Sequence, residues 1–188
     1  RALPMGADAV MSREQWLLAL RLFGCIVAAT ESLHDSGVCH FDLKLQNVLL
    51  RREPRVGDNE VRLSNVVCLT DFGEALYLPG HHASDIHTDR SRGTDCIKSP
   101  EMLRVGMGAQ REALEGVSGV SCASDVWSLG CLLFELVTGE FLFASDDWGR
   151  LFHAVTAGDG DFVADDAEVP LSAAHREQFV RAMRYMLV

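Results

Sequence analysis

Hydrophobic and polar residues alternate with a helical period over the first forty residues of the chain. In residues 11–37 apolar side chains recur three and four positions apart, which predicts one long amphipathic helix. Ser12 and Gln15 fit a capping box at its start, and Gly37 suits a left-handed C-terminal cap. The face predicted to be buried consists of Trp16, Leu20, Phe23, Val27, Thr30, Leu33 and His34.

A second stretch, residues 124–139, is apolar nearly all round and starts with a serine and an aspartate. A helix without a polar face belongs in the centre of a domain, so this segment is predicted to be a central helix. Two more helices are expected at 147–155 and 172–188, and a short one at "SPEMLR", residues 99–104.

The segments between the helices predict a small amount of β structure. Short β-type runs occupy 38–40, 47–50 and 66–70. Residues 51–62 are charged and contain Pro, Gly, Asp and Asn, as expected for a hairpin tip. Polar, punctuated sequence predicts exposed loops at 73–98, 104–121 and 157–170. The expected fold class is mainly α, with about six helices and one small β hairpin.

Composition restricts the function only loosely. The chain has 188 residues, enough for one domain or one large lobe, and a formal net charge of −10. Because nucleic acids and anionic membranes attract clustered Lys and Arg, the acidic balance argues against both as the main partner. It leaves basic protein substrates open. The chain begins at Arg1 and ends in "AMRYMLV", and we expect it to be a piece of a longer protein.

The six cysteines contain no CxxC pair and no regular spacing. Cys25, Cys39, Cys68 and Cys131 lie in apolar stretches, which predicts reduced and mostly buried thiols in a cytoplasmic protein. No secretory signal opens the sequence, and no uninterrupted apolar run has the ~18–20 residues of a membrane span.

Four polar residues in and after the predicted hairpin point to phosphoryl transfer. Asp42, Lys44 and Asn47 lie within "DLKLQN", and Asp71 follows the next β-type run. Transfer from a nucleotide needs a carboxylate for the attacking hydroxyl, a cation for the phosphoryl charge and hard oxygen ligands for Mg²⁺. Asp42, Lys44 and the pair formed by Asn47 and Asp71 match these needs in turn.

Four ordered motifs resemble those of eukaryotic protein kinases. "HFDLKLQN" resembles the H-R-D-L-x-x-x-N catalytic loop, "DFG" the magnesium motif, "RGTDCIKSPEM" the end of the activation segment, and "SDVWSLGCLLFELVTG" the buried helix that follows. The resemblance implies that residues 1–188 form the C-terminal, helical lobe of a kinase. Its parts would be the catalytic loop 40–47, the magnesium motif 71–73, the activation segment 71–101, the insert 104–121 and the central helix at about 124–138.

The resemblance also implies roles for single residues. Asp42 would be the catalytic base, Lys44 the γ-phosphate contact, and Asn47 and Asp71 the metal ligands, with ATP and Mg²⁺ as cofactors. Lys44, with Gly93 and Thr94 downstream, implies Ser or Thr in a protein substrate. The remaining positions are Leu49 under the adenine, His40 and Phe72 stacked between the lobes, Thr94 bridging Asp42 and Lys44, Asp125 tying the catalytic loop to the central helix, and Glu101 in the A-P-E motif.

Plainer alternatives exist for several of these residues. Asp42 alone could be a turn residue, and Asp125 a helix N-cap. Phe72 could be core filler, and His40 a satisfied core histidine. In the family Glu101 pairs with an Arg that would lie beyond Val188, so we expect it to be left unpaired in this chain.

Some family features are missing from the chain. It has no Gly-rich phosphate loop, no V-A-I-K-type lysine and no helix carrying that lysine's Glu partner. These belong to the N-terminal lobe, which would be the obligatory partner surface. We therefore expect the isolated chain to bind nucleotide poorly and to self-associate through uncovered apolar surface.

Three functions remain open at this point. The first is a Ser/Thr kinase that is active in the full-length protein. The second is a pseudokinase scaffold, supported by Phe41, by Ser99 in "SPE" and by the inserts. The third is a small-molecule kinase. The segment "RGTDCIKSPEM" argues against it, because it resembles the part of a kinase that docks a protein substrate.

Phe41 stands where many kinases have an arginine that pairs with a phosphorylated activation loop. A phenyl ring makes no such pair, so loop phosphorylation is not expected to activate through residue 41. The alternative is that Phe41 simply packs below the loop. The same loop contains hydroxyls at Ser84, Thr88, Ser91 and Thr94, and possible metal ligands at His81, His82, Asp85 and His87, which are better explained as solvated loop residues.

Overall fold

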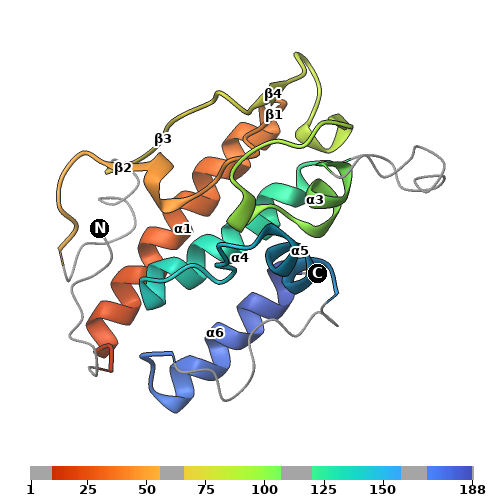
Figure 1. The fold of residues 1–188 in the computed structure, drawn as a ribbon. Coiled ribbons are helices and arrows are strands. Elements are labelled where there is room, and N and C mark those ends of the chain that lie inside the picture. Colours follow the sequence, from red (N-terminus) through yellow and green to blue (C-terminus); the bar gives the residue numbers. More distant parts are fainter. Residues whose placement is uncertain (1–9, 56–65, 107–119, 158–168, 188) are drawn as a thin grey trace.

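The computed structural model describes residues 10–55, 66–106, 120–157 and 169–187 (Figure 1). The helices are α1 (Arg13–Asp35), α3 (Pro100–Gly106), α4 (Ala123–Thr138), α5 (Trp148–Thr156) and α6 (Ala173–Met186). The strands are β1 (Val38–Cys39), β2 (Val48–Leu50), β3 (Val67–Leu69) and β4 (Leu76–Tyr77). Short 3-10 turns form η1 (Leu45–Asn47), η2 (Ala83–Asp85) and η3 (Asp95–Ile97). The described chain is mainly α, as predicted, with five α-helices where about six were expected.

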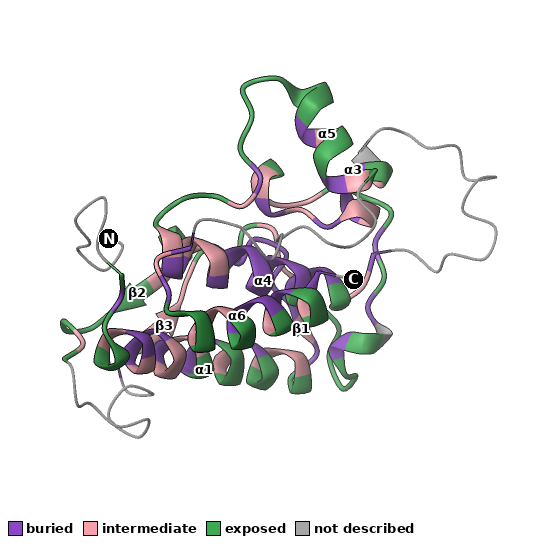
Figure 2. Ribbon diagram, turned by 90° about the horizontal axis from the view of Figure 1, so that it is seen from below, coloured by how far each residue is buried: buried purple, intermediate pink, exposed green. Residues whose placement is uncertain are grey.

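The central position of α4 explains its apolar sequence. It packs against both α1 and α6 (Figure 1) and is buried along most of its length (Figure 2). At Gly130 a Cβ would lie 2.9 Å from Cδ2 of Leu187, so glycine allows the C-terminal end of α6 to approach. The main core cluster forms around this contact and includes Trp127, Leu133 and Phe179.

The ends of α1 agree with the prediction from the sequence, but its buried face does not. The Ser12 hydroxyl accepts from Gln15 N at 3.2 Å, and Ser12 N donates to Gln15 Oε1 at 2.8 Å, completing the capping box. The chain leaves the helix through Gly37 with φ 76°. The prediction for the buried face was partly wrong: Val27 is 36% exposed, and Leu20, Phe23, Leu33 and His34 are only half-buried. The buried residues are Trp16, Leu18, Ala19, Leu22, Cys25, Ile26 and Thr30.

Two neighbours decide which side of α1 is covered. Leu22 packs with Val67 of β3, and Ile26 packs with Leu129 and Leu132 of α4. By length and composition α1 is also the one described helix that could cross a bilayer. The core helix of a globular fold meets the same criteria, and Arg21 and Glu31 interrupt the apolar stretch of α1, so the prediction that no uninterrupted apolar run reaches this length is not contradicted.

The hairpin predicted around 47–70 is present. β2 and β3 pair antiparallel, with Leu49 opposite Cys68. Its tip and most of the 104–121 insert and of the 157–170 loop lie outside the described residues. A second two-stranded sheet was missed, in which β1 pairs with β4 and Val38 lies opposite Tyr77.

The expected long exposed loop at 73–98 needs a correction. It contains β4, η2 and η3, and it buries Ala83, Ile86, Thr88 and Ile97. An isolated bridge joins Thr88 to Val120, through hydrogen bonds of 2.9 and 3.0 Å. Single apolar residues, separated by polar ones, hold this segment on the body of the fold. Neither they nor a two-residue strand such as β4 produce a recognisable sequence pattern.

None of the six cysteines, all of them within the described residues, forms a disulfide. Cys25, Cys39 and Cys131 are buried as predicted, whereas Cys68 is only half-buried. Burial raises the pKa of the Cys39 and Cys131 thiols, with neighbouring negative groups adding to the effect. Thiolates are the reactive form, so these two thiols are chemically quiet.

Candidate active site

A carboxylate from the central helix shapes the loop formed by residues 40–47. Asp125 is fully buried, and its Oδ1 accepts from Phe41 N at 2.7 Å. Its Oδ2 accepts from His40 N at 2.8 Å and from Nε2 of His34, on α1, also at 2.8 Å. The N-cap of α4 is Cys122, so the alternative that Asp125 only caps the helix is excluded.

These bonds hold a left-handed backbone at Phe41, where φ is 60°. For a residue with a Cβ that conformation costs about 1–2 kcal/mol. Each hydrogen bond to a charged acceptor returns about 1.5–3 kcal/mol, which outweighs the cost. The kink turns the chain so that the next side chain, Asp42, points away from α4 into the polar network described below.

Asp42 lies at the centre of that network and is 5% exposed. Its Oδ1 accepts from both Thr94 N, at 2.8 Å, and Thr94 Oγ1, at 2.7 Å. Its Oδ2 lies 2.9 Å from Lys44 Nζ and 3.0 Å from Asn47 Nδ2. Lys44 Nζ also donates to Thr94 Oγ1 at 2.6 Å, so the hydroxyl bridges the two charged groups, as expected from the sequence.

The charge on Asp42 follows from these contacts. Burial raises the pKa of its carboxyl group, but hydrogen bonds from Lys44 and Thr94 and the Lys44 charge outweigh burial, so the pKa is lowered. The group is therefore an anion at neutral pH, and four donors, two on each oxygen, hold it in place.

Asn47 presents an oxygen beside this carboxylate. Its Nδ2 donates to the Asp42 carbonyl at 2.8 Å and to the Asp42 side chain, which leaves the Oδ1 end as an acceptor. Thr70 N and Oγ1 donate to the Asn47 carbonyl at 3.0 and 3.1 Å, which brings the following residue, Asp71, close to Asn47.

Asp71 is exposed and has a left-handed backbone with φ 62°. Its Oδ1 accepts weakly from Gly73 N at 3.4 Å. One carboxylate and one amide oxygen are a chemically suitable set for Mg²⁺, which keeps several waters and takes further ligands from substrate phosphates. Within the described residues, no three His, Cys, Asp or Glu side chains gather at a metal-binding distance.

His82, in the 81–87 stretch, takes part in local contacts. His82 Nδ1 accepts from Ser84 N at 3.1 Å and caps η2, and its Nε2 lies 3.4 Å from Asp35 Oδ1. Of the loop hydroxyls, Ser84 and Ser91 are exposed, and Thr88 is buried.

His40 and Phe72 stack beside the network. Their ring centroids are 5.0 Å apart, with the planes tilted by 52°. His40 is fully buried; its Nε2 donates to the Thr70 carbonyl at 3.1 Å and its Nδ1 accepts from Asp42 N at 3.3 Å. These partners require a neutral ring with the proton on Nε2. Phe72 is 47% exposed, so in this chain it does not simply fill the core.

An apolar surface borders the site. Leu49 on β2 is 53% exposed, and Phe72, shortly after β3, is 47% exposed. Leu50, 44% exposed, is the next residue of the strand, so its side chain points to the opposite face. Exposed large side chains of this kind, gathered near polar groups that converge, mark a surface that binds something.

The serine of "SPE" has a structural explanation. Ser99 is buried, its carbonyl accepts from Leu103 N at 3.0 Å, and its hydroxyl lies 2.8 Å from that of Ser124. Ser124 Oγ also lies 2.8 Å from Glu101 Oε1, as a donor to it. In the part of the chain that the structure describes, Glu101 thus contacts a hydroxyl and forms no ion pair.

A model of the protein kinase domain matches residues 10–178. This match covers most of the chain and every residue of the network around Asp42. The chain belongs to the protein kinase family. The fold agrees with this assignment, because a mainly helical body with small two-stranded sheets carries the kinase motifs in their expected order.

Curated serine/threonine kinases are similar to this kinase chain. A probable serine/threonine-protein kinase of Dictyostelium discoideum is 40% identical over 153 residues, which are 74% of this chain and 6% of that protein. Serine/threonine-protein kinase 33 of Bos taurus is 26% identical over 73% of this chain and 25% of its own length. 3-Phosphoinositide-dependent protein kinase 1 of Homo sapiens is 29% identical over 73% of this chain and 20% of its own length. The chain therefore spans a quarter or less of each of these relatives.

Sequence reasoning missed three supports of the kinase site. His34 was expected on a buried helix face, yet it binds Asp125 directly. Met102 accepts from Arg92 N through its sulfur at 3.2 Å, a contact that no pattern predicts. Glu135 accepts from Gln46 at 3.1 Å, on the turn that carries Asn47; burial raises the pKa of this carboxyl group, although the hydrogen bonds oppose it.

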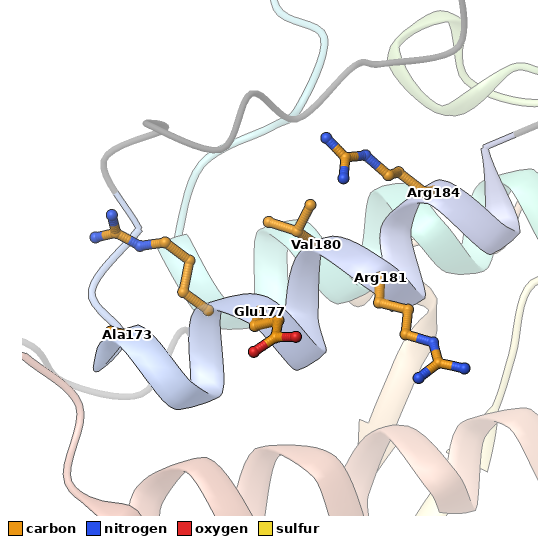
Figure 3. Close-up of a pocket in the computed structure, with 6 residues that line it drawn as sticks. Ala173, Glu177, Val180, Arg181 and Arg184 are labelled. Carbon is orange, nitrogen blue, oxygen red and sulfur yellow. The ribbon is translucent and has the colours of Figure 1, made fainter.

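A groove of about 660 Å³ runs along α6, apart from the network around Asp42 (Figure 3). Its lining consists of Ala173, Arg176, Glu177, Val180, Arg181 and Arg184. Figure 3 shows Arg184 and Arg181 pointing to different sides of the helix, so the arginines do not converge on one point. None of the residues predicted for the kinase site lies here.

Proposed function

We propose that this chain is the C-terminal lobe of a Ser/Thr protein kinase, which transfers the γ-phosphate of ATP to a protein hydroxyl in the full-length protein. The observation that carries the proposal is the joint contact of Asp42 with Lys44, Asn47 and Thr94. If Asp42 were only a turn or cap residue, its carboxylate would not require contacts with a lysine, an amide and a threonine from a distant segment. Phosphoryl transfer needs this kind of set.

Asp42 is proposed to orient the substrate hydroxyl and receive its proton. Its lowered pKa keeps it anionic, which favours orientation of the hydroxyl and limits its strength as a free base. In kinases the transition state is loose, so the proton need not leave early. Thr94 fixes the carboxylate from the side of the 71–101 segment, where a protein substrate would lie.

Lys44 is proposed to contact the γ-phosphate. Its side chain is 20% exposed, and its ammonium group contacts both Asp42 and Thr94. From there it stabilises the negative charge of the transferred group without covalent chemistry.

Asn47 and Asp71 would hold Mg²⁺, and Leu49 would lie under the adenine. The donor set fits, since it offers one amide oxygen and one exposed carboxylate at the end of β3. When bound, Mg²⁺ neutralises phosphate charge and orients the phosphates for in-line transfer. The chain's own contribution is to fix the Asn47 amide through its bond to Asp42 and the backbone just before Asp71 through the bond of Thr70 to Asn47.

We further propose that the surface formed by Leu49 and Phe72 is where the N-terminal lobe rests. The support is the exposure of these side chains beside the site and the lack of any Gly-rich phosphate loop in this sequence. The 188-residue chain alone should then bind Mg-ATP only weakly. Isothermal titration tests this, and micromolar affinity for the chain alone would contradict it. A cytoplasmic location and reduced cysteines complete the proposal.

The experiment for the function itself is phosphotransfer by the full-length protein. γ-Labelled ATP and a mixture of basic and acidic proteins are supplied, and the labelled amino acids are identified. Label on Ser or Thr, lost in Asp42→Asn and kept in the matched surface variant Asp147→Asn, supports the proposal. Label on Tyr alone, or equal labelling by Asp42→Asn, contradicts it. Nucleotide binding without any transfer is the result that a pseudokinase would give.

A further inference from the structure

The side chain of Phe41 lies in an apolar cluster to which the 71–101 segment contributes two buried residues. The ring is 3% exposed. The buried members of the cluster are Cys39, Phe41, Ala83, Ile86, Met102 and Val120. Ala83 and Ile86 come from the middle of the segment, Met102 directly follows its end, and Cys39 lies on β1. The ring is therefore buried in one cluster with residues of β1 and of the segment.

The backbone of Phe41 is fixed as well. Its N–H donates to the buried carboxylate of Asp125, and its φ of 60° sets the direction in which the ring leaves the chain. Its carbonyl lies against Gly93, which has φ 80° and where any Cβ would collide with that oxygen. Gly93 belongs to the segment, so Phe41 meets the segment through both its side chain and its backbone.

The cluster is connected to the network around Asp42. Met102, 1% exposed and packed in the cluster with Phe41, accepts the Arg92 N–H through its sulfur. Arg92 also donates from Nη1 to the Glu74 carbonyl at 3.1 Å. Two residues further on, Thr94 binds the Asp42 carboxylate. A displaced segment would thus take Thr94 away from Asp42.

Apolar and backbone contacts help to hold the middle of the segment. Thr88 is 7% exposed, its backbone pairs with Val120, and its hydroxyl accepts from Arg90 N at 3.1 Å. Thr88 is therefore engaged and shielded from modification. Ile86 N donates to the Ala83 carbonyl at 3.0 Å within the same turn.

We infer that Phe41 is a positioning residue that holds the 71–101 segment on the 40–47 loop by apolar contact, so that Thr94 reaches Asp42 without a phosphate. The inference rests on the proposed kinase function for its effect on turnover. It goes beyond the absence of a phosphate-binding arginine, because it assigns Phe41 a positive role and names the contacts that perform it.

The test is amide hydrogen exchange in the full-length, phosphatase-treated protein, with Phe41→Ala and Phe41→Leu beside the wild type. Alanine keeps the same left-handed backbone penalty, so the comparison reports the side chain. The reporters are the amides of Thr88 and Thr94, whose hydrogen bonds close the segment. We expect Phe41→Ala to speed their exchange about 10-fold or more, and Phe41→Leu by less than about 3-fold.

Phe143→Ala is the matched control, since Phe143 is buried against Trp127 in the main core. It should destabilise the whole fold without a selective effect on Thr88 and Thr94. In turnover assays Phe41→Ala should lower kcat about 10-fold with little change in KM for ATP, and phosphatase treatment should leave wild-type turnover unchanged. Leucine should restore most of kcat.

Two results would overturn the inference. One is a segment in Phe41→Ala that exchanges as slowly as in the wild type. The other is a wild-type segment that becomes protected, with turnover rising, only after phosphorylation of Ser84 or Ser91. If the wild type transfers no phosphate at all, the proposed function fails, and the exchange of Thr88 and Thr94 still decides the role of Phe41.

Discussion

Asp125 on α4 accepts a 2.7 Å hydrogen bond from the backbone N of Phe41, across 84 residues of sequence. The same carboxylate binds His40 N and His34 Nε2. One buried anion therefore joins three parts of the fold and holds the left-handed turn that presents Asp42. The geometry of the kinase site depends on this carboxylate more than on any local propensity of the loop.

Replacing Asp125 with Asn should destabilise the 188-residue chain. The variant keeps one oxygen but points an amide group at an N–H donor, so a buried donor loses its partner. We expect a loss of about 2–4 kcal/mol in the free energy of unfolding. Urea unfolding measures this against Asp147→Asn, the same change at an exposed N-cap that asparagine fills equally well. A difference below about 0.5 kcal/mol between the two variants would contradict the account.

Thr94→Val should lower turnover of the full-length protein by about 10- to 100-fold, because it removes the hydroxyl that joins Lys44 to Asp42 at nearly constant volume. Thr94→Ser keeps the hydroxyl and should retain most of the rate. Thr156→Val on α5, whose hydroxyl only binds the Phe152 carbonyl, is the control. Equal rates for the valine and serine variants would show that the bridge has no role.

The lowered pKa of Asp42 predicts a pH dependence of stability. A carboxyl group with a depressed folded pKa contributes stability above its ordinary value, 3.8 here, and loses it as the pH falls through the folded pKa. The free energy of unfolding of the wild type, relative to Asp42→Asn, should therefore rise as the pH increases towards about 5 and then stay constant. Urea titrations between acid and neutral pH measure it. A relative stability that falls as the pH rises over this range would contradict the sign of the predicted effect. A relative stability that changes above about pH 6 would show that a group other than Asp42 is responsible.

The sequence predicted the helices and the local part of the site well, for physical reasons. Capping residues such as Ser12 and Gln15 act through neighbouring backbone groups, so they fix a helix start without tertiary contacts. Asp42, Lys44 and Asn47 lie in one short loop, and their spacing alone brings them together. Thr94 is 52 residues from Asp42, and only the kinase resemblance placed it there.

The failures share one cause, which is packing between distant segments. The apolar pattern of α1 is compatible with burial of either of two adjacent faces of the helix. The face that contains Leu22 and Ile26 is buried because it packs against Val67 and Leu129. β4 has two residues and exists because β1 is there to pair with it. Asp125 was expected to tie the loop to the helix, but its partner His34 could not be found from spacing.

The isolated 188-residue chain should self-associate. Leu49 and Phe72 are about half exposed beside the site, as is Leu50 on the opposite face of β2, and burying such side chains is favourable by about 25 cal/mol per Å². Sedimentation should show oligomers that grow with concentration, and the double variant Leu49→Lys, Leu50→Lys should shift the chain towards monomer. The control, Arg181→Ala in the groove on α6, should not. A wild-type chain that stays monomeric at high concentration would contradict the proposed lobe surface.

The most direct measurement is phosphotransfer by the full-length protein beside Asp71→Ala, each titrated with Mg²⁺ at saturating ATP. Asp71 is exposed and makes only a weak contact with Gly73, so its loss should leave the fold intact, which circular dichroism and urea unfolding can verify. We predict that turnover falls about 100-fold or more and that added Mg²⁺ does not restore it. Equal turnover in the two proteins would contradict the account.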